Sequence, residues 1–219
     1  MKPLTIIGTG PFAEIAALYF ETFQGRDVVS YAVSERFEGQ DSFLGRPLIE
    51  ISELPRSYPP ESVECFVAIG YRDMNRHRMR IAESLVADGY TLATFIHPNV
   101  NVWDNSRIGM NVFIFEDNTL QPFTRIGDGS VLWSGNHIGH HSEVGRYAFI
   151  ASHVVISGSC RIGDGVFIGV NATLHDGVAI GDFALVGAGA LVSRDVPDRA
   201  VVSPAATRPR EQTTDEIDF

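Results

Sequence analysis

The sequence is poor in cysteine and almost free of lysine. Its 219 residues include two cysteines, Cys65 and Cys160, which lie far apart in apolar stretches. A disulfide framework or a cysteine-based metal site needs more thiols at closer spacing, so the sequence supports neither, and the two cysteines are expected in the core. Lys2 is the only lysine, and cationic contacts to a ligand therefore fall to arginine.

An excess of positive charge and long apolar runs are also missing. The chain has 17 Lys+Arg against 27 Asp+Glu, a formal net charge of −10, and such a surface repels a phosphate backbone. No stretch approaches the roughly 20 apolar residues of a membrane helix, and the N-terminus runs into a glycine turn instead of a signal-peptide cleavage site. We therefore expect a cytoplasmic protein without nucleic-acid or membrane partners.

A six-residue repeat fills the C-terminal half. Every sixth residue from Ile108 to Val192, 15 positions in all, is Ile, Leu or Val, and glycine often follows it. An inward aliphatic residue and a turn-permissive glycine are typical of short parallel strands, three of which close a coil of about 18 residues. The repeat predicts an all-β parallel β-helix of roughly five coils without loop insertions. Weaker repeat positions at Ile96 and Val102 suggest an entry coil before them.

The N-terminal half has the alternating strands and helices of an α/β unit. The expected elements are strands at 4–7, 28–33, 65–69 and 91–96 and helices at 11–23 and 72–88. This order predicts a small parallel sheet covered by helices. We expect an N-terminal domain over residues 1–97, the β-helix domain over 98–206 and a polar, acidic tail over 207–219.

A glycine turn joins the first strand to the first helix. Gly8, Gly10 and Ala13 have the spacing of a nucleotide-binding turn, in which missing side chains let a phosphate approach a helix N-terminus. The same glycines could serve only to make a sharp turn. Glu35 could accept a hydrogen bond from a ribose hydroxyl. Because the unit is short for a complete dinucleotide fold, a mononucleotide or a nucleotide-linked sugar is favoured over NAD.

The histidines gather in the repeat, where five of seven fall: His137, His140, His141, His153 and His175. Stacking by 18 residues puts Pro122 below His140 and Gly158 above it, so the missing side chain at Gly158 is expected to leave space for a substrate beside the imidazole. A neutral imidazole can take a proton from an attacking amine or hydroxyl. The alternative is that these histidines pack at a subunit contact.

The three histidines at 137, 140 and 141 also suggest a zinc site, because three imidazoles and a water molecule can form a catalytic zinc site. In extended backbone, however, neighbours such as His140 and His141 point to opposite faces. One chain is then unable to supply all three ligands, and no metal is expected.

These motifs resemble those of the bacterial hexapeptide-repeat acyltransferases, and within them the PglD/NeuD-like sugar acetyltransferases. The resemblance covers nearly the whole chain. Besides the repeat, it rests on three short segments: Ile7-Gly8-Thr9-Gly10, Ala68-Ile69-Gly70 and Ile96-His97-Pro98. It implies a left-handed β-helix after a small Rossmann-like domain. It also implies a homotrimer with active sites between adjacent β-helices, acetyl-CoA as co-substrate and a nucleotide-linked sugar held by the N-terminal unit.

The resemblance also assigns roles to residues of this chain. The general base falls on His140. The backbone that contacts CoA falls near Gly158, Val170 and Ala188, and the nucleotide-sugar turn falls at Gly8 and Gly10. Glu35 and Gly70 are the other substrate contacts expected in the N-terminal unit. Relatives often have an acidic residue after the catalytic histidine, where this chain has His141, and Glu143 is a candidate for orienting the base.

Together these features predict an acetyltransferase that acts on the amino group of a nucleotide-linked sugar by direct attack, with a histidine base. Transfer to a sugar or sialic-acid-like hydroxyl is the alternative within this class, because the same base serves both acceptors. A metal-dependent lyase like the γ-type carbonic anhydrases and a non-catalytic nucleotide-sugar-binding protein are the alternatives from other classes.

Overall fold

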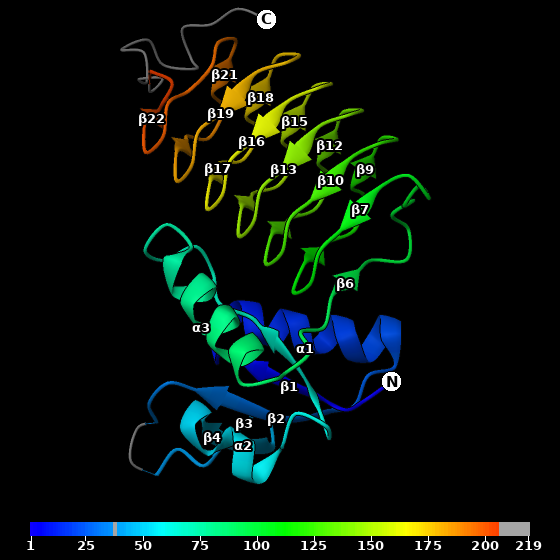
Figure 1. The fold of residues 1–219 in the computed structure, drawn as a ribbon, viewed down its shortest axis with the longest axis vertical. Helices are drawn as coiled ribbons and strands as arrows, with labels where there is room; N and C mark the ends of the chain where they lie inside the picture. Colours follow the sequence, from blue (N-terminus) through cyan, green and yellow to red (C-terminus); the bar gives the residue numbers. More distant parts are fainter. Residues whose placement is uncertain (37–38, 206–219) are drawn as a thin grey trace, which may run out of the picture.

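The structure, a computed structural model, describes residues 1–36 and 39–205. The chain forms an α/β unit followed by a stack of triangular coils (Figure 1). The acidic tail expected at 207–219 lies outside the described residues. No helix of the described part is long and apolar enough to cross a membrane.

The N-terminal unit is built on one sheet with the strand order β3-β4-β2-β1-β5. Its elements are β1 (Leu4–Ile7), α1 (Pro11–Gln24), β2 (Val28–Val33), β3 (Ser42–Phe43), β4 (Arg46–Glu50), a 3₁₀ turn (Ile51–Glu53), α2 (Leu54–Ser57), β5 (Glu64–Val67) and α3 (Arg76–Ala87). Four strands pair in parallel, and only β3 runs antiparallel to its neighbour β4. The expected parallel sheet is therefore confirmed, and the β3–β4 hairpin is an addition to it.

Helix α1 begins and ends close to its expected limits. Pro11 occupies the first turn, where its missing N–H removes no helical hydrogen bond, and Gly25 ends the helix in a left-handed conformation with φ 61°.

Helix α3 begins four residues later than expected. Asp73, Met74 and Asn75 all have positive φ, which non-glycine residues seldom adopt and which no α-helix continues through.

The strand expected at 91–96 is divided between the two units. Leu92 bridges Cys65 in the N-terminal unit, whereas β6 (Phe95–Ile96) pairs with β8 (Phe113–Ile114) in the β-helix. Ile96 packs against the β-helix interior as expected. The prediction of a weaker repeat position at Val102 is wrong, because this side chain is 39% exposed.

The C-terminal half is a parallel β-helix with three faces, each made of two-residue strands stacked at a register of 18 residues. The arginine face has β7 (Arg107–Ile108), β10 (Arg125–Ile126), β13 (Glu143–Val144), β16 (Arg161–Ile162) and β19 (Ala179–Ile180). The Thr/Val face has β9 (Thr119–Leu120), β12 (His137–Ile138), β15 (Val155–Ile156), β18 (Thr173–Leu174) and β21 (Leu191–Val192). The aromatic face has β6, β8 (Phe113–Ile114), β11 (Val131–Leu132), β14 (Phe149–Ile150), β17 (Phe167–Ile168), β20 (Leu185–Val186) and β22 (Val201–Val202).

The second residue of each strand points inward and carries the six-residue repeat. From Ile114 to Val192 every predicted repeat position is at most 4% exposed, and Ile108 at the open end packs against the same core. Glycine is required at corners where coils touch. A Cβ placed on Gly127 would lie 2.6 Å from the carbonyl carbon of Gly145 in the next coil.

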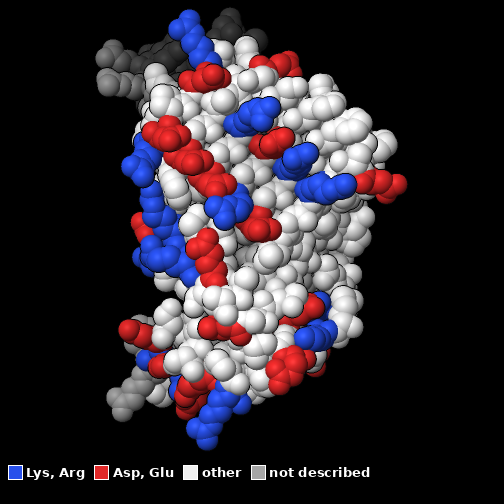
Figure 2. All heavy atoms as spheres, viewed as in Figure 1, with Lys and Arg blue, Asp and Glu red and all other residues white. Residues whose placement is uncertain are grey.

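The outward residues differ from face to face. Acidic and basic side chains are interspersed on the side of the β-helix drawn in Figure 2. The aromatic face instead receives the N-terminal unit, where Phe12 and Phe20 from α1 pack against Phe113 with ring centroids 5.5 and 5.9 Å apart. Asn111, at a corner of the β-helix, accepts a hydrogen bond of 2.8 Å from the Val67 N–H of β5. The two units therefore share one core on this face.

Truncation of an inward residue tests this packing. Ile150 is fully buried, so Ile150→Ala should lower the free energy of unfolding by roughly 2–5 kcal/mol, through lost burial and the cavity left behind. Val201→Ala is the control, because Val201 is 69% exposed and its truncation should change stability by less than about 0.5 kcal/mol. Urea unfolding measures both, and equal effects would contradict the assignment of inward positions.

Candidate functional site

The N-terminal unit holds a pocket of about 650 Å³ at the carboxyl ends of its parallel strands. The β1–α1 turn, the end of β2 and the segment after β5 line it, and ligands bind at this end of such sheets. All four residues predicted to contact the substrate lie in its wall: Gly8, Gly10, Glu35 and Gly70. The structure therefore brings together residues that are far apart in the sequence.

The two glycines of the turn have different roles. Gly8 has φ +125°, and a Cβ there would lie 2.9 Å from the carbonyl oxygen of Ala68 in the neighbouring segment. Only glycine allows this approach. A Cβ at Gly10 would meet nothing within 4 Å, so this position opens onto free space at the N-terminus of α1, where anions are favoured.

Among the residues lining this pocket that sequence reasoning missed, three have side chains suited to ligand contacts. Tyr71, Arg72 and His77 also line it. Arg72 brings a cationic group to the pocket wall, in a chain with almost no lysine. The signal that could have identified Arg72 is its place just after Gly70, at the carboxyl end of a parallel strand.

His140 lies at the edge between β12 and β13, here called the histidine edge, and is exposed. Its backbone N–H donates to Oε1 of Gln121 at 2.8 Å. The ring leans over Gly158 so closely that a Cβ there would come within 2.7 Å of Cε1. The space expected beside the imidazole is therefore filled by the imidazole itself, and a substrate has to approach from outside the edge.

The expectation that His140 and His141 point to opposite faces is wrong. It applies to extended strands, whereas these residues form a corner at which His141 has φ 59°. The two Nδ1 atoms lie 3.2 Å apart, and the His141 ring stacks on Phe123 with centroids 4.6 Å apart. With Nδ1 of His140 facing His141, its Nε2 is the atom free to meet a substrate.

Glu143, the candidate for orienting His140, lies on the arginine face. Its carboxylate oxygens are 4.0 and 3.9 Å from nitrogens of Arg125 and Arg161. The side chain that contacts the His140 ring through a polar atom is His141. Within residues 1–36 and 39–205, no three His, Cys, Asp or Glu side chains come together as a possible metal site.

The residues predicted to contact CoA lie on two edges of the β-helix. Gly158 is on the histidine edge, beside His140. Val170 and Ala188 follow β17 and β20 at the edge between the aromatic and Thr/Val faces, here called the Val170 edge. One chain by itself does not bring the three together.

A polar cluster joins α1 to the Val170 edge. Glu116 accepts hydrogen bonds from the hydroxyls of Tyr19 and Ser134, at 2.9 and 2.6 Å. Burial alone would raise the pKa of Glu116, but these hydrogen bonds, one from its own backbone and the charge of His97 outweigh burial and lower it. Burial and the neighbouring carboxylate raise the pKa of Tyr19 to about 12. At neutral pH the Glu116 carboxylate is therefore an anion that accepts hydrogen bonds from the neutral hydroxyls of Tyr19 and Ser134.

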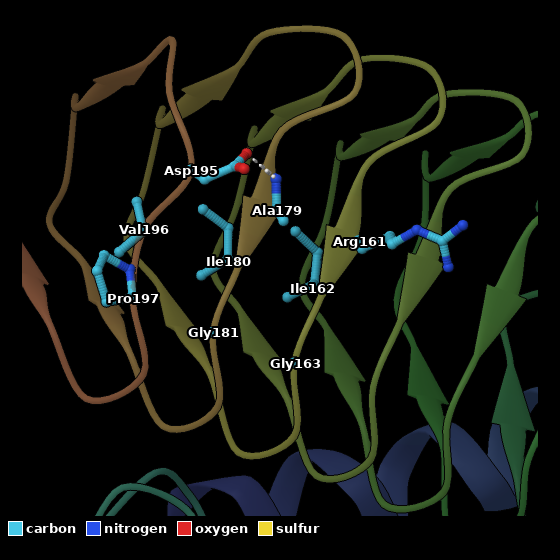
Figure 3. Close-up of a pocket in the computed structure, with 9 residues that line it drawn as sticks. All are labelled: Arg161, Ile162, Gly163, Ala179, Ile180, Gly181, Asp195, Val196 and Pro197. Carbon is cyan, nitrogen blue, oxygen red and sulfur yellow. Dashed lines mark hydrogen bonds between the residues drawn. The ribbon is translucent and has the colours of Figure 1, made fainter.

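A shallower hollow of about 330 Å³ lies on the arginine face near the C-terminal coils (Figure 3). Its floor is apolar, with Ile162, Ile180 and Val196. The Asp195 carboxylate at its rim already accepts a hydrogen bond of 2.9 Å from the Ala179 N–H. It contains no predicted site residue, and the pocket of the N-terminal unit and the histidine edge remain the candidate sites.

The profile of the bacterial transferase hexapeptide (six repeats) family matches residues 123–158 and 159–194. None of the curated protein sequences compared with the chain matches it.

Solved structures match over both units. A variant of perosamine N-acetyltransferase from Caulobacter crescentus, in complex with CoA and GDP-perosamine, is 26% identical with a TM-score of 0.82 and covers 92% of this chain and 93% of its own. The acetyltransferase domain of PglB from Neisseria gonorrhoeae, in complex with acetyl coenzyme A, is 27% identical with a TM-score of 0.63 and covers 91% and 95%. WeeI from Acinetobacter baumannii shares the fold at 20% identity, with a TM-score of 0.79 and coverage of 93% and 97%.

Proposed function

Since the chain carries the hexapeptide repeat of bacterial transferases and resembles sugar acetyltransferases over both of its units, we propose that it transfers an acetyl group from acetyl-CoA to the amino group of a nucleotide-linked amino sugar. In this proposal the β-helix is left-handed and the N-terminal unit is a Rossmann-like domain that holds the nucleotide sugar. The single observation that carries the proposal is the pocket that unites Gly8, Gly10, Glu35 and Gly70.

The pocket suits a nucleoside diphosphate linked to a sugar. The N-terminus of α1 and Arg72 offer positive charge for the phosphates, and Glu35 offers an acceptor for a ribose hydroxyl. Nothing within 4 Å of a Cβ at Gly10 would hinder close approach of the phosphates. Both perosamine N-acetyltransferase and PglB were solved with a CoA species, and the former also with a GDP-linked sugar.

Within a single chain, the pocket and the proposed base lie on opposite sides of the β-helix. The N-terminal unit packs on the aromatic face, and the histidine edge is the edge of the β-helix opposite that face. The nucleotide sugar in the pocket of one copy therefore has to meet His140 of another. A complete site needs at least two copies of this chain.

Three copies around an axis satisfy this need. The outward residues of the Thr/Val face lack the charges of the arginine face: Thr119, His137, Val155, Thr173 and Leu191. When this face turns toward a three-fold axis, the histidine edge of each copy meets the Val170 edge of the next. His140 and Gly158 then face Val170 and Ala188, which reunites the proposed CoA contacts in a homotrimer.

The chemistry proposed at this site is direct acyl transfer. The amine nitrogen of the sugar attacks the thioester carbonyl carbon, and Nε2 of His140 takes a proton from it. As the tetrahedral intermediate collapses, the carbon–sulfur bond breaks and His140 returns the proton to the departing CoA sulfur. His141 orients the ring through Nδ1, and backbone N–H groups stabilise the oxyanion.

Release of free CoA, followed with a thiol reagent, tests this function. The parent protein is incubated with acetyl-CoA and a panel of nucleotide-linked amino sugars, their hydroxyl counterparts and free sialic acid. Turnover only with amino sugars supports the proposal, and turnover only with hydroxyl acceptors replaces it with O-acetylation. No turnover with any acceptor contradicts it.

Removal of the base should slow the chemical step. His140→Ala is expected to lower kcat by roughly 10²–10⁴-fold, because a general base contributes about this much, while KM for both substrates changes little. His175→Ala is the control, since His175 is an exposed histidine of the same β-helix to which no role is assigned. Near-normal turnover by His140→Ala would show that another group takes the proton.

Filling the pocket should affect only the sugar substrate. Gly10 has φ −87° and open space before it, so Gly10→Val is expected to fold normally and to raise KM for the nucleotide sugar by at least roughly tenfold, through steric exclusion of the phosphates. KM for acetyl-CoA should stay the same. Loss of acetyl-CoA binding instead would contradict the proposed division of the two substrates between the units.

A further inference from the structure

Arg78, near the start of α3, is completely buried and bonds only to backbone carbonyls in the described structure. Its Nη1 donates to the carbonyl oxygens of Ile69 and Gly70, both at 3.0 Å. Its Nε donates to Gly129 at 3.0 Å, and its Nη2 to Tyr147 at 2.9 Å. The guanidinium therefore joins a segment of the N-terminal unit to a corner of the β-helix.

The segment that Arg78 holds is part of the pocket wall. Ile69 and Gly70 both line the pocket, next to the β1–α1 turn. The chain continues through Tyr71, whose ring contacts Phe149 and Phe167 with centroids 5.0 and 4.9 Å away. The position of this wall is thus set by the β-helix as well as by the sheet to which it belongs.

The following residues need such support. Asp73, Met74 and Asn75 have φ values of 53°, 46° and 65°, and residues other than glycine pay an energetic cost in this region. The Asn75 amide donates to the carbonyl oxygen of Gly165 at 2.9 Å. Two side chains, Arg78 and Asn75, therefore fasten a strained segment to successive coils of the β-helix.

A guanidinium is the side chain suited to this task. It presents five N–H donors in a planar fork, and an ammonium group lacks the reach and geometry to bond carbonyls on both sides. Burial lowers the pKa of Arg78 to about 9, which leaves it protonated at neutral pH. Burying a charge without a carboxylate partner is costly. The contacts of Phe12 and Phe20 with Phe113 already join the two units without that cost, so joining the units does not by itself require a buried arginine.

On this basis we propose that Arg78 is a positioning residue for the nucleotide-sugar pocket: it sets the Ile69–Gly70 wall against the β-helix and so determines how tightly the nucleotide-linked sugar binds. The inference rests on the proposed function for the identity of the ligand. Arg78 itself touches no substrate, and its effect passes through the two carbonyls that it holds.

The test compares two buried arginines. Arg78→Lys keeps the charge and removes the fork. Arg26→Lys is the matched control, because Arg26 is 7% exposed and pairs with Glu64 at 2.6 Å, at the opposite end of the strands from the pocket. Thermal unfolding is measured first, and all kinetic measurements are made well below both melting temperatures.

Arg78→Lys is expected to raise KM for the nucleotide sugar by roughly tenfold, because a small displacement of a binding wall has effects of this size. Its kcat and its KM for acetyl-CoA should stay within about twofold of the parent values. Arg26→Lys should lower the melting temperature without changing either KM. Unchanged KM in Arg78→Lys, or equal changes in the two variants, would overturn the proposal and leave Arg78 a purely structural residue.

Calorimetric binding of UDP, GDP and dTDP separates this inference from the proposed function. If the parent binds one of these nucleotides but transfers no acetyl group, the proposed function fails while weaker binding by Arg78→Lys still supports the role of Arg78. If the parent binds none of them and turns over no nucleotide-linked sugar, the proposal for Arg78 is overturned.

Discussion

The stacking of coils at an 18-residue register constrains every other feature of this structure. Each coil places one aliphatic residue per strand in the interior, and the corners then leave no room for a side chain at positions such as Gly127. Because the register is uninterrupted from β7 to β21, the three faces and three edges run straight along the β-helix. Residues 18 apart, such as His140 and Gly158, therefore meet on one edge.

The same register gives each face its own chemistry. Outward aromatic residues collect on one face and form a shared core with α1 and β5, while arginines collect on another. The N-terminal unit is consequently fixed on the side of the β-helix that lies away from His140. The separation of pocket and base in one chain follows from this arrangement, and it is the physical reason for proposing that copies of the chain share their sites.

The sequence predicts the features that depend on local spacing. The repeat identified the interior positions, and the glycine turn with Glu35 and Gly70 identified four residues that one pocket unites. Features that depend on tertiary contacts were missed. The β3–β4 hairpin is short and contains Pro47, which is seldom found inside a strand, so it shows no clear strand period. The strand at 91–96 divides because it pairs with two different sheets.

Corner geometry and buried charge were also beyond sequence reasoning. Strand alternation does not hold where His141 takes a positive φ, and the contact between the two histidines could not be read from their spacing. Arg78 lies in a helix with polar and charged neighbours, where arginine is expected on the surface. Its burial arises only from the docking of the two units, which no local pattern records.

Mixing two slow variants tests most directly whether one site is shared between copies, provided that the nucleotide sugar is kept well below its KM, where both variants are slow. His140→Ala retains the pocket, and Gly10→Val retains the base. In the proposed trimer, random assortment of the two variants should restore roughly one quarter of the parent activity, because one site in four then combines an intact pocket with an intact base from the adjacent copy. If the mixture is no more active than the mean of the separate variants while co-assembly is verified with two affinity tags, each site lies within a single chain and the account is wrong.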